Sequence, residues 1–505
     1  MKIIRTSSLA LTALFSLFVQ ISALPTGVTL AGKGLVAGDA QDKSGLTGNI
    51  CQAGVLSNCV TKAILGGFGS DIAYTGFDNV FVAAPDRGPF DGLTDVPYID
   101  RFHFFHIVTN VGAPFPNIEA TLLDTRFLRN EFGQRFVGAA GSFDTDAPLK
   151  TLRLDPEGIA VAPDGTFYLS DEYGPYMFQF DRQGNIIRRI AVPAKFAIAN
   201  PSSDPNAELT GNASGRQANR GMEGLAITPD GSTLFGLMQN ALLQDHGLSP
   251  GTTNRLGLNN RILKVDLATG ETHEYVYMLD AINQGKGTND ILAINDHEFL
   301  VIERDNRSNL QTPPAAPAVK KIYKIDVTGA TDVSAVASLP AGALPAGTVP
   351  VAKSVFIDML EPGLGLSAGI AEKLEGLAWG PDLEDGRHLL YVVSDNDLNP
   401  GIGTQLYSFA ISTSVLNFQA QYLPGPLFPP GQVKKALKKT RITGRSCEAL
   451  NGRGRSFPRP FLFGIEKEAH LMCLGEFKVR YGRVGVVGEA DTINTVSGFK
   501  LALAY

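Results

Sequence analysis

The sequence contains little cysteine, and after its N-terminus it has no long apolar run. Only 4 of the 505 residues are Cys, too few for a disulfide-held scaffold, and no spacing resembles a zinc site. No stretch after residue 23 is long and apolar enough to form a membrane helix, so we expect no transmembrane segment in the mature chain. No glycine-rich phosphate loop precedes a helix, and a net charge of −6 gives no case for nucleic-acid binding.

The charge that is present is divided unevenly along the chain. Residues 413–505 hold 14 Lys and Arg against 6 Asp and Glu, so an acidic body carries a basic tail. Hydrophobic residues make up 44% of the chain, which is enough for a large buried core. We expect an irregular C-terminal extension over 413–505, either a basic appendage that binds anionic surfaces or an artefact of the gene model.

The N-terminus has the pattern of a secretory signal. Lys2 and Arg5 precede an apolar run, and a small residue, Ala23, ends the segment, which predicts a signal peptide over residues 1–23. Secretion favours a disulfide between Cys51 and Cys59, which lie close in sequence. Two sequons, at Asn212 and Asn306, are compatible with a glycoprotein. We expect a secreted monomer.

A short unit recurs along the acidic body. It consists of an apolar run that follows an acidic residue, a Pro-Asp-Gly type turn, and a β-branched or aromatic run. Such a unit is typical of a β-hairpin. Five copies, spaced by 87, 66, 67 and 85 residues, begin at Ser70, Glu157, Glu223, Asp290 and Glu375.

Further strand candidates lie between the hairpins, so each unit holds about four short strands, the pattern of an all-β propeller. We expect the propeller over residues 24–412. Its length suits six blades, with seven as the alternative. Only five hairpins are visible, and a sixth blade could be split between the N-terminal segment and a strand at Gln405–Ile411.

The hairpin geometry predicts where the acidic residues meet. The first residue of one strand lies opposite the last residue of its partner, so every blade brings acidic groups to one mouth of the channel. Converging carboxylates repel one another unless a cation lies among them, and carboxylate oxygens suit Ca²⁺. The predicted metal ligands are Glu157, Glu223, Asp290 and Glu375.

The ends of the second strands supply the other predicted site residues. Glu172 is the predicted general base, and Asp171 and Asp86 accompany it as catalytic candidates. Arg87 and Arg304 would hold negative charge. The full predicted substrate-binding set is Arg87, Arg304, Glu303 and Asp395. A structural alternative stays open, in which these acids hold the blades together and the arginines form salt bridges between blades.

Several motifs together resemble the phytase-like family described as having esterase-like activity of phytase. They occur in the family's order over about residues 65–412, and include Ala84–Pro89, Asp155–Ala160, Leu169–Pro175 and Asn219–Ala226. The resemblance implies a secreted β-propeller that hydrolyses esters or phosphoesters. The repeated unit is also similar to that of calcium-dependent gluconolactonase-like propellers.

These observations lead to one hypothesis with two alternatives. The hypothesis is a small-molecule phosphoester or ester hydrolase with Ca²⁺ at the channel mouth. The same site could instead open a lactone. In the second alternative the propeller is not catalytic, and its channel or its tail binds a partner.

Overall fold

The computed structural model describes residues 24–174, 176–280 and 287–422, together with Val433 and Leu437. The chain divides into two compact units, Met1–Val433 and Lys434–Tyr505. All of the described residues except Leu437 belong to the first unit. The expected signal peptide and most of the expected basic extension lie outside the described residues.

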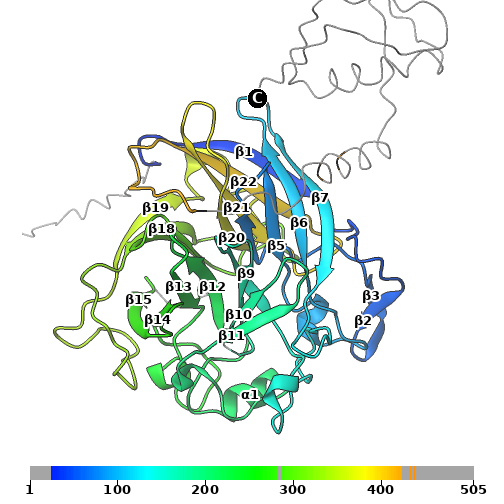
Figure 1. The fold of residues 1–505 in the computed structure, drawn as a ribbon, viewed down its shortest axis with the longest axis vertical. Helices are drawn as coiled ribbons and strands as arrows, with labels where there is room; N and C mark the ends of the chain where they lie inside the picture. Colours follow the sequence, from blue (N-terminus) through cyan, green and yellow to red (C-terminus); the bar gives the residue numbers. More distant parts are fainter. Residues whose placement is uncertain (1–23, 175, 281–286, 423–432, 434–436, 438–505) are drawn as a thin grey trace, which may run out of the picture. The chain divides into compact units, whose positions relative to one another are not determined.

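Five four-stranded antiparallel sheets surround a central channel, so the described chain forms a five-bladed propeller (Figure 1). Blade 1 runs outward through β4 (Asp71–Tyr74), β5 (Val80–Ala84), β6 (Arg101–Thr109) and β7 (Ile118–Phe127). Blade 2 consists of β8 (Pro156–Val161), β9 (Phe167–Asp171), β10 (Tyr176–Phe180) and β11 (Ile186–Ile190). Blade 3 consists of β12 (Met222–Ile227), β13 (Thr233–Met238), β14 (Asn259–Asp266) and β15 (Thr272–Met278). Blade 4 consists of β16 (Gly287–Ala293), β17 (Glu298–Arg304), β18 (Lys320–Asp326) and β19 (Ala352–Asp358).

Blade 5 is assembled from both ends of the propeller. It consists of β20 (Lys373–Trp379), β21 (His388–Asp395), β22 (Thr404–Ile411) and, outermost, β1 (Val28–Val36). β1 pairs with β22 from Val28 opposite Ile411 to Val36 opposite Thr404. The predicted split blade therefore exists, but it is the blade of the fifth hairpin. The prediction of six blades was wrong, because the N-terminal strand and β22 complete a hairpin that had already been counted.

The hydrophobic core lies between neighbouring blades. One buried cluster joins Leu300 and Ile302 of blade 4 to Leu377 and Val392 of blade 5, and similar clusters join blades 2 and 3, 3 and 4, and 5 and 1. The five inner strands contact one another in a closed ring: β4, β8, β12, β16, β20 and again β4. Burial of apolar faces between blades thus fixes the inner strands around the channel.

The two ends of the channel differ in their loops. At the end where the inner strands begin, called the mouth, long connections such as 128–155 and 191–221 join the strands. At the opposite end, called the floor, most connections are short turns, with the loop 327–351 as an exception. Gly165 and Gly231 end two Pro-Asp-Gly turns at φ 81° and 76°, a conformation that favours glycine. These turns confirm that the repeated units are β-hairpins.

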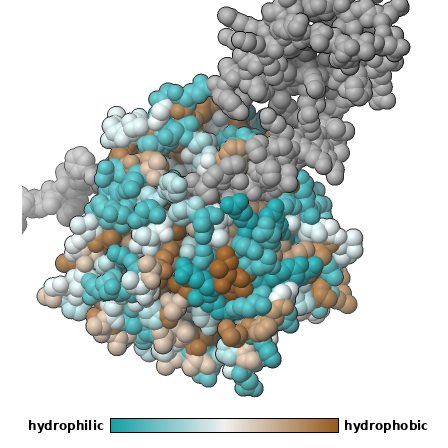
Figure 2. Space-filling model, in the orientation of Figure 1, coloured by the Kyte–Doolittle hydropathy of each residue, from teal (hydrophilic) through white to brown (hydrophobic). Residues whose placement is uncertain are grey.

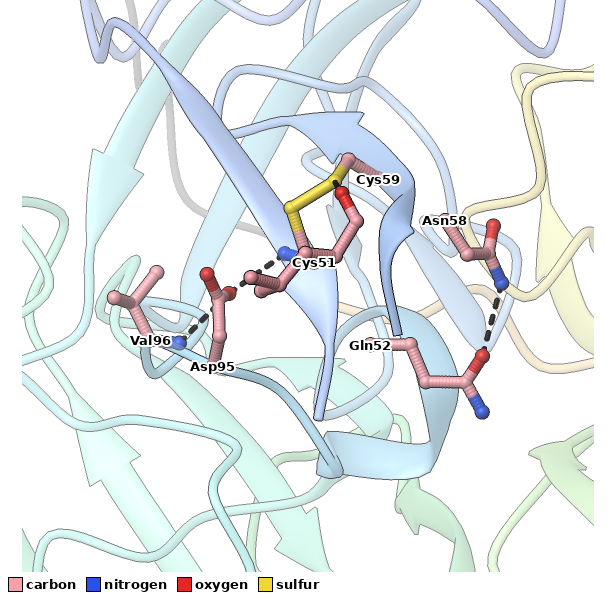
Figure 3. The surroundings of a disulfide bond; sticks show 7 residues. Cys51, Gln52, Asn58, Cys59, Asp95 and Val96 are labelled. Carbon is pink, nitrogen blue, oxygen red and sulfur yellow. Dashed lines mark hydrogen bonds between the residues drawn. A yellow bond between two sulfur atoms is a disulfide. The ribbon is translucent and has the colours of Figure 1, made fainter. Parts of the chain in front are cut away.

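A small disulfide-linked hairpin lies at the edge of the ring (Figures 1 and 3). It consists of β2 (Asn49–Gln52) and β3 (Val55–Thr61), and the predicted disulfide joins Cys51 to Cys59 directly across it. Asp95 accepts a hydrogen bond of 2.7 Å from the Cys51 N–H, so the hairpin is fixed to the loop that follows blade 1's second strand. That loop also carries Asp86 and Arg87.

Helices contribute little to the described residues. Within the described part of residues 24–422, the α-helix is α1 (Pro205–Thr210), capped by Asp204. Short 3-10 helices lie at Pro89–Gly92, Pro148–Lys150, Ala194–Phe196, Leu243–Asp245 and Pro362–Leu364. Among the described residues, no helix has the length and apolar character needed to cross a membrane. On the face drawn in Figure 2, small groups of hydrophobic side chains lie between hydrophilic ones.

The chain continues in contact with the propeller beyond the expected boundary at residue 412. Gln419 donates its N–H to the Ile294 carbonyl at 2.9 Å, and Tyr422 donates to Pro229 at 2.8 Å. This segment borders a cavity of about 220 Å³ at the floor end of the channel. The walls of that cavity are mainly apolar residues of the inner strands, together with Trp379 and Phe418.

Candidate active site

The inner strands are bulged where their acidic residues stand. In β12 the pairing skips from Met222 to Gly224, and in β20 it skips from Leu374 to Gly376. Glu223 and Glu375 are the extra residues at these bulges. A bulge breaks the alternation of the strand and re-aims a side chain. Similar irregularities occur in β8 and β16, so four of the five blades present a bulge at the mouth.

The bulge of β16 contains two polar residues, Asn289 and Asp290, and the first of them joins the ring of glutamates. The Asn289 side-chain amide donates to Glu223 Oε1 at 2.7 Å and to Glu375 Oε1 at 3.3 Å. Asn289 therefore occupies in blade 4 the place that Glu223 and Glu375 occupy in their own blades.

Asp290 lies one residue deeper, facing Asp71 of blade 1 across the channel. Asp290 accepts hydrogen bonds from the N–H groups of Ile291 at 2.6 Å and Leu377 at 2.7 Å. Asp71 accepts in the same way from Ile72 and Ile159, each at 2.7 Å. Burial, followed by the charge of Asp290, raises the pKa of Asp71 well above its usual value, and burial raises that of Asp290 to about 7. The structure thus places Asp290 in a pair that links blades, apart from the three glutamates with which it was predicted.

Glu157 lies at the centre of the acidic mouth. Oxygens of Asp86, Asp155 and Glu157 lie within 4.8 Å of one another, and so do oxygens of Glu157, Glu172 and Glu223. Burial raises the pKa of Glu157 well above its usual value, and the charges of Glu223 and Asp155 add to this effect. Glu157 accepts no hydrogen bond from any residue within the described ranges, although only 6% of its surface is exposed.

Two further oxygens at the mouth are buried without a partner. They are Asp86 Oδ1 and Glu223 Oε2, neither of which has a hydrogen-bond partner in the described part of the chain. Burial raises the pKa of Asp86 well above its usual value and, despite the nearby Arg87, raises that of Asp155 to about 6. A set of oxygen donors with unpartnered buried atoms fits a hard cation such as Ca²⁺.

The two arginines predicted to hold the substrate are engaged by buried carboxylates. Arg87 forms an ion pair with Asp155, donates to Asp91 Oδ1 at 3.0 Å and lies 3.5 Å from Glu172 Oε2. Arg304 forms an ion pair with Glu375 and a hydrogen bond with Asn306. Both side chains are largely neutralised within the protein, and both position a predicted site carboxylate.

Asp171, the last residue of β9, and Glu172, which follows it, have different surroundings. Glu172 Oε1 accepts a hydrogen bond of 2.9 Å from the Gly221 N–H, so its carboxylate is oriented at the mouth. Asp171 Oδ1 instead accepts from the N–H groups of Asp155 at 2.9 Å and Tyr173 at 3.1 Å. The structure therefore brings Glu172 to the acidic cluster and uses Asp171 to fix the backbone around it.

The remaining predicted substrate-binding residues lie apart from each other. Glu303 accepts a hydrogen bond of 2.7 Å from the Tyr277 hydroxyl of blade 3 and forms an ion pair with Lys353 on the outermost strand of its own blade. Asp395 lies 3.5 Å from Lys373, and it shares an acidic group with Asp86 and Asp397. Asp395 thus borders the mouth near Asp86, whereas Glu303 does not.

Two mouth cations, Arg220 and Arg255, were not predicted. Arg220 lies on a strained turn, since Asn219 before it has φ 53°, and it hydrogen-bonds the Gln239 side chain. Burial and the charge of Arg220 lower the pKa of Arg255 to about 10. Asp155 and Asn289 were also missed as site residues. Arg220 and Asp155 stand inside the motifs Asn219–Ala226 and Asp155–Ala160, so a signal for them was present in the sequence.

Known proteins share parts of this architecture. An uncharacterized secreted protein of Arthroderma benhamiae is 28% identical over 361 residues, covering 58% of this chain and 66% of that protein, in agreement with the predicted secretion. Regucalcin, a calcium-binding protein from Agrobacterium tumefaciens, is 10% identical with a TM-score of 0.31, covering 70% of this chain and 92% of its own.

A gluconolactonase from Xanthomonas campestris is 11% identical with a TM-score of 0.28, covering 76% of this chain and 98% of its own. TM-scores this low carry no argument about function. Residues 63–398, more than half of the chain, match the model of the phytase-like family, described as "esterase-like activity of phytase". This span includes all five inner strands and every residue of the acidic mouth, and the chain belongs to the phytase-like family.

Proposed function

We propose that this protein is a secreted hydrolase that cleaves phosphoesters at the acidic mouth with the help of a bound divalent cation, most simply Ca²⁺. The observation that carries the proposal is the position of Glu157. Its buried carboxylate belongs to two groups of three acids and has no hydrogen-bond donor among the described residues. Carboxylates in such a place repel one another unless protons or a cation compensate their charge.

The proposed cation ligands come from blades 2 and 3 and from the loop after β5. Asp86, Asp155, Glu157 and Glu223 are the proposed set, drawn from the two acid groups, and Glu172, the fifth acid of these groups, lies beside them. When bound, the cation would polarise a substrate oxygen and make water a better nucleophile. Asn289 and Gln239 orient Glu223 through its Oε1, which leaves Oε2 unpartnered.

Glu172 is the residue that we propose removes the proton from the attacking water. The Gly221 N–H holds its Oε1, and Arg87 lies 3.5 Å from its Oε2, so the carboxylate has a fixed orientation. A positioned carboxylate of this kind can act as a general base. Arg87, itself fixed by its ion pair with Asp155, would help to hold this orientation.

The test uses the full secreted chain, stripped of metal with a chelator. The phosphate and the acetate of one chromogenic alcohol are offered before and after Ca²⁺ is restored. We expect calcium-dependent release from the phosphate, and a loss of roughly 100-fold or more in Glu157→Gln. Glu384→Gln, an exposed glutamate away from the mouth, is the matched control and should keep full activity.

Three results would argue against the proposal. Full activity of Glu157→Gln would remove the site assignment. Preference for the acetate would make the protein a carboxylesterase. Release of neither alcohol, with normal folding, would favour a lactone substrate or a propeller that only binds a partner.

A further inference from the structure

The arginines of the mouth fall into two kinds. Arg87 and Arg304 form ion pairs with buried carboxylates. Arg220 and Arg255 form no ion pair with any residue of the described ranges, although both are at least partly shielded from solvent. A guanidinium without a carboxylate partner in a partly buried place is costly unless a ligand supplies the negative charge.

Arg220 is held in place by its backbone and by one neutral side chain. The residue before it, Asn219, has a left-handed φ of 53°, and the residue after it, Gly221, donates its N–H to Glu172. The Arg220 guanidinium donates to Gln239, whose own amide donates to Glu223. Its position is therefore tied to Glu172 and to the proposed cation ligand Glu223, and among the described residues its guanidinium has no hydrogen-bond acceptor other than Gln239.

Arg255 reaches the same region from the loop between β13 and β14. A backbone bridge joins Arg255 to Leu248, and the following Leu256 donates its N–H to the Gly247 carbonyl at 2.9 Å. The Arg255 Nε is buried and has no hydrogen-bond partner in the part of the chain that the structure describes. Gln217, three residues before Arg220, donates its side-chain amide to the carbonyls of Ala241 at 2.7 Å and Gly247 at 3.3 Å, so hydrogen bonds join the two loops that carry these arginines.

Two like charges that lie together without an ion-paired carboxylate among the described residues indicate a site for an anion. Glu172 and Glu223 act on Arg220 only at longer range than an ion pair. A divalent cation bound by Glu223 would take up part of that negative charge. Guanidinium groups bind phosphate oxygens through paired N–H donors and opposite charge. A neutral ester offers no such charge.

We propose that Arg220 and Arg255 bind the phosphate group of the substrate beside the cation, so that the mouth selects phosphate esters over neutral carboxylic esters. This inference rests on the proposed function and assigns the substrate class of the same site. Arg87 and Arg304 then serve as positioning residues for Asp155 and Glu375.

The experiment measures inorganic phosphate binding to the full chain by titration calorimetry, with Ca²⁺ present, so that it does not depend on turnover. The variants are Arg220→Gln, Arg255→Gln and the charge-preserving Arg220→Lys, and sulfate is titrated in parallel. Arg189→Gln is the control, because Arg189 forms an exposed ion pair with Glu131 in blade 2. Thermal unfolding of each variant reports folding.

We expect each Gln variant to weaken phosphate binding roughly tenfold, Arg220→Lys to weaken it less, and Arg189→Gln to leave it unchanged. Unchanged phosphate affinity in the folded Arg220→Gln and Arg255→Gln chains overturns the inference. So does equally tight binding of sulfate, which would show an unselective anion site. Should Arg220→Gln fail to fold, Arg255→Gln and Arg220→Lys still decide the question.

The outcome separates this inference from the proposed function. Phosphate binding that depends on both arginines, in a chain that hydrolyses nothing, supports the anion site and contradicts the hydrolase. Hydrolysis in which Arg220→Gln and Arg255→Gln leave the ratio of phosphate to acetate cleavage unchanged supports the hydrolase and contradicts the anion site.

Discussion

The two ends of the channel are built from the same five strands and differ in almost every other respect. The mouth has long loops, bulged strands and buried acids, and the floor has mostly short turns and an apolar cavity of about 220 Å³. Asp71 and Asp290 lie between the two regions and bind backbone N–H groups of neighbouring blades. Carboxylates of one channel thus differ in their hydrogen bonds: Asp71 and Asp290 accept from backbone N–H groups, whereas Glu157 accepts from no donor among the described residues.

The largest expected effect is on the free energy of unfolding. It distinguishes carboxylates that join blades from carboxylates that would bind a cation. Asp290→Ala removes an acceptor for the N–H groups of Ile291 and Leu377 and leaves both buried. We expect a loss of about 3 kcal/mol in the free energy of unfolding, measured by denaturant titration. The calcium-induced rise in melting temperature should persist in this variant.

The opposite result would restore the assignment of Asp290 made from sequence. If Asp290→Ala keeps its stability and loses its response to Ca²⁺, then Asp290 is a cation ligand. The distinction between carboxylates that join blades and carboxylates that bind a cation would then be wrong. Glu157→Gln provides the contrast, since it should keep its stability without metal and lose the calcium response.

A second effect concerns pH. The pKa of Asp155 is raised from 3.8 to about 6, so the folded, metal-free chain binds this proton more tightly than the unfolded chain does. The stability from this group is complete below pH 3.8 and is lost as the pH rises through 6. Ca²⁺ competes with such protons, so the rise in melting temperature on adding Ca²⁺ should grow from pH 4 to pH 7.

Differential scanning calorimetry with and without Ca²⁺ measures this difference directly, and contributions from groups far from the mouth cancel in it. A calcium effect of equal size at both pH values would contradict cation binding by carboxylates with raised pKa values. Glu157→Gln should make the effect smaller at every pH.

The smallest expected effect tests the floor. The Phe418 ring lies 4.8 Å from the Trp379 ring and 4.1 Å from the His388 ring, measured between centroids. Phe418→Ala should reduce the free energy of unfolding by about 1 kcal/mol, because the ring is only half-buried. Hydrolysis at the mouth should not change, and a large loss of activity would show that the two ends are coupled.

The sequence predicted the hairpins, the propeller, the disulfide and the convergence of acids well, because each depends on local spacing. The repeated units, Glu-Gly-Ile-Ala in one blade and Glu-Gly-Leu-Ala in two others, place Glu157, Glu223 and Glu375 at matching points of three blades. The blade number was wrong because it depends on which strands pair at closure. Nothing in the local pattern of Val28–Val36 shows that its partner is β22.

The roles of single charges were harder to predict than their positions. Asp290 was aligned with the glutamates, and a shift of one residue at the β16 bulge puts Asn289 there instead. The sequence predicted that Arg304 binds a substrate, but in the structure Arg304 forms an ion pair with Glu375 of the next blade. Whether a charge is free depends on contacts between residues far apart in sequence, such as the 71 residues that separate Arg304 from Glu375.

The pairing of β1 with β22 has a consequence for how the molecule forms. The last blade needs residues from both ends of the propeller, so the ring cannot close until Ile411 has been synthesised. Pairing of such distant strands is slow, because closing the long loop costs conformational entropy before any favourable contact forms. The N-terminal strand therefore stays without its partner until the rest of the propeller chain is present.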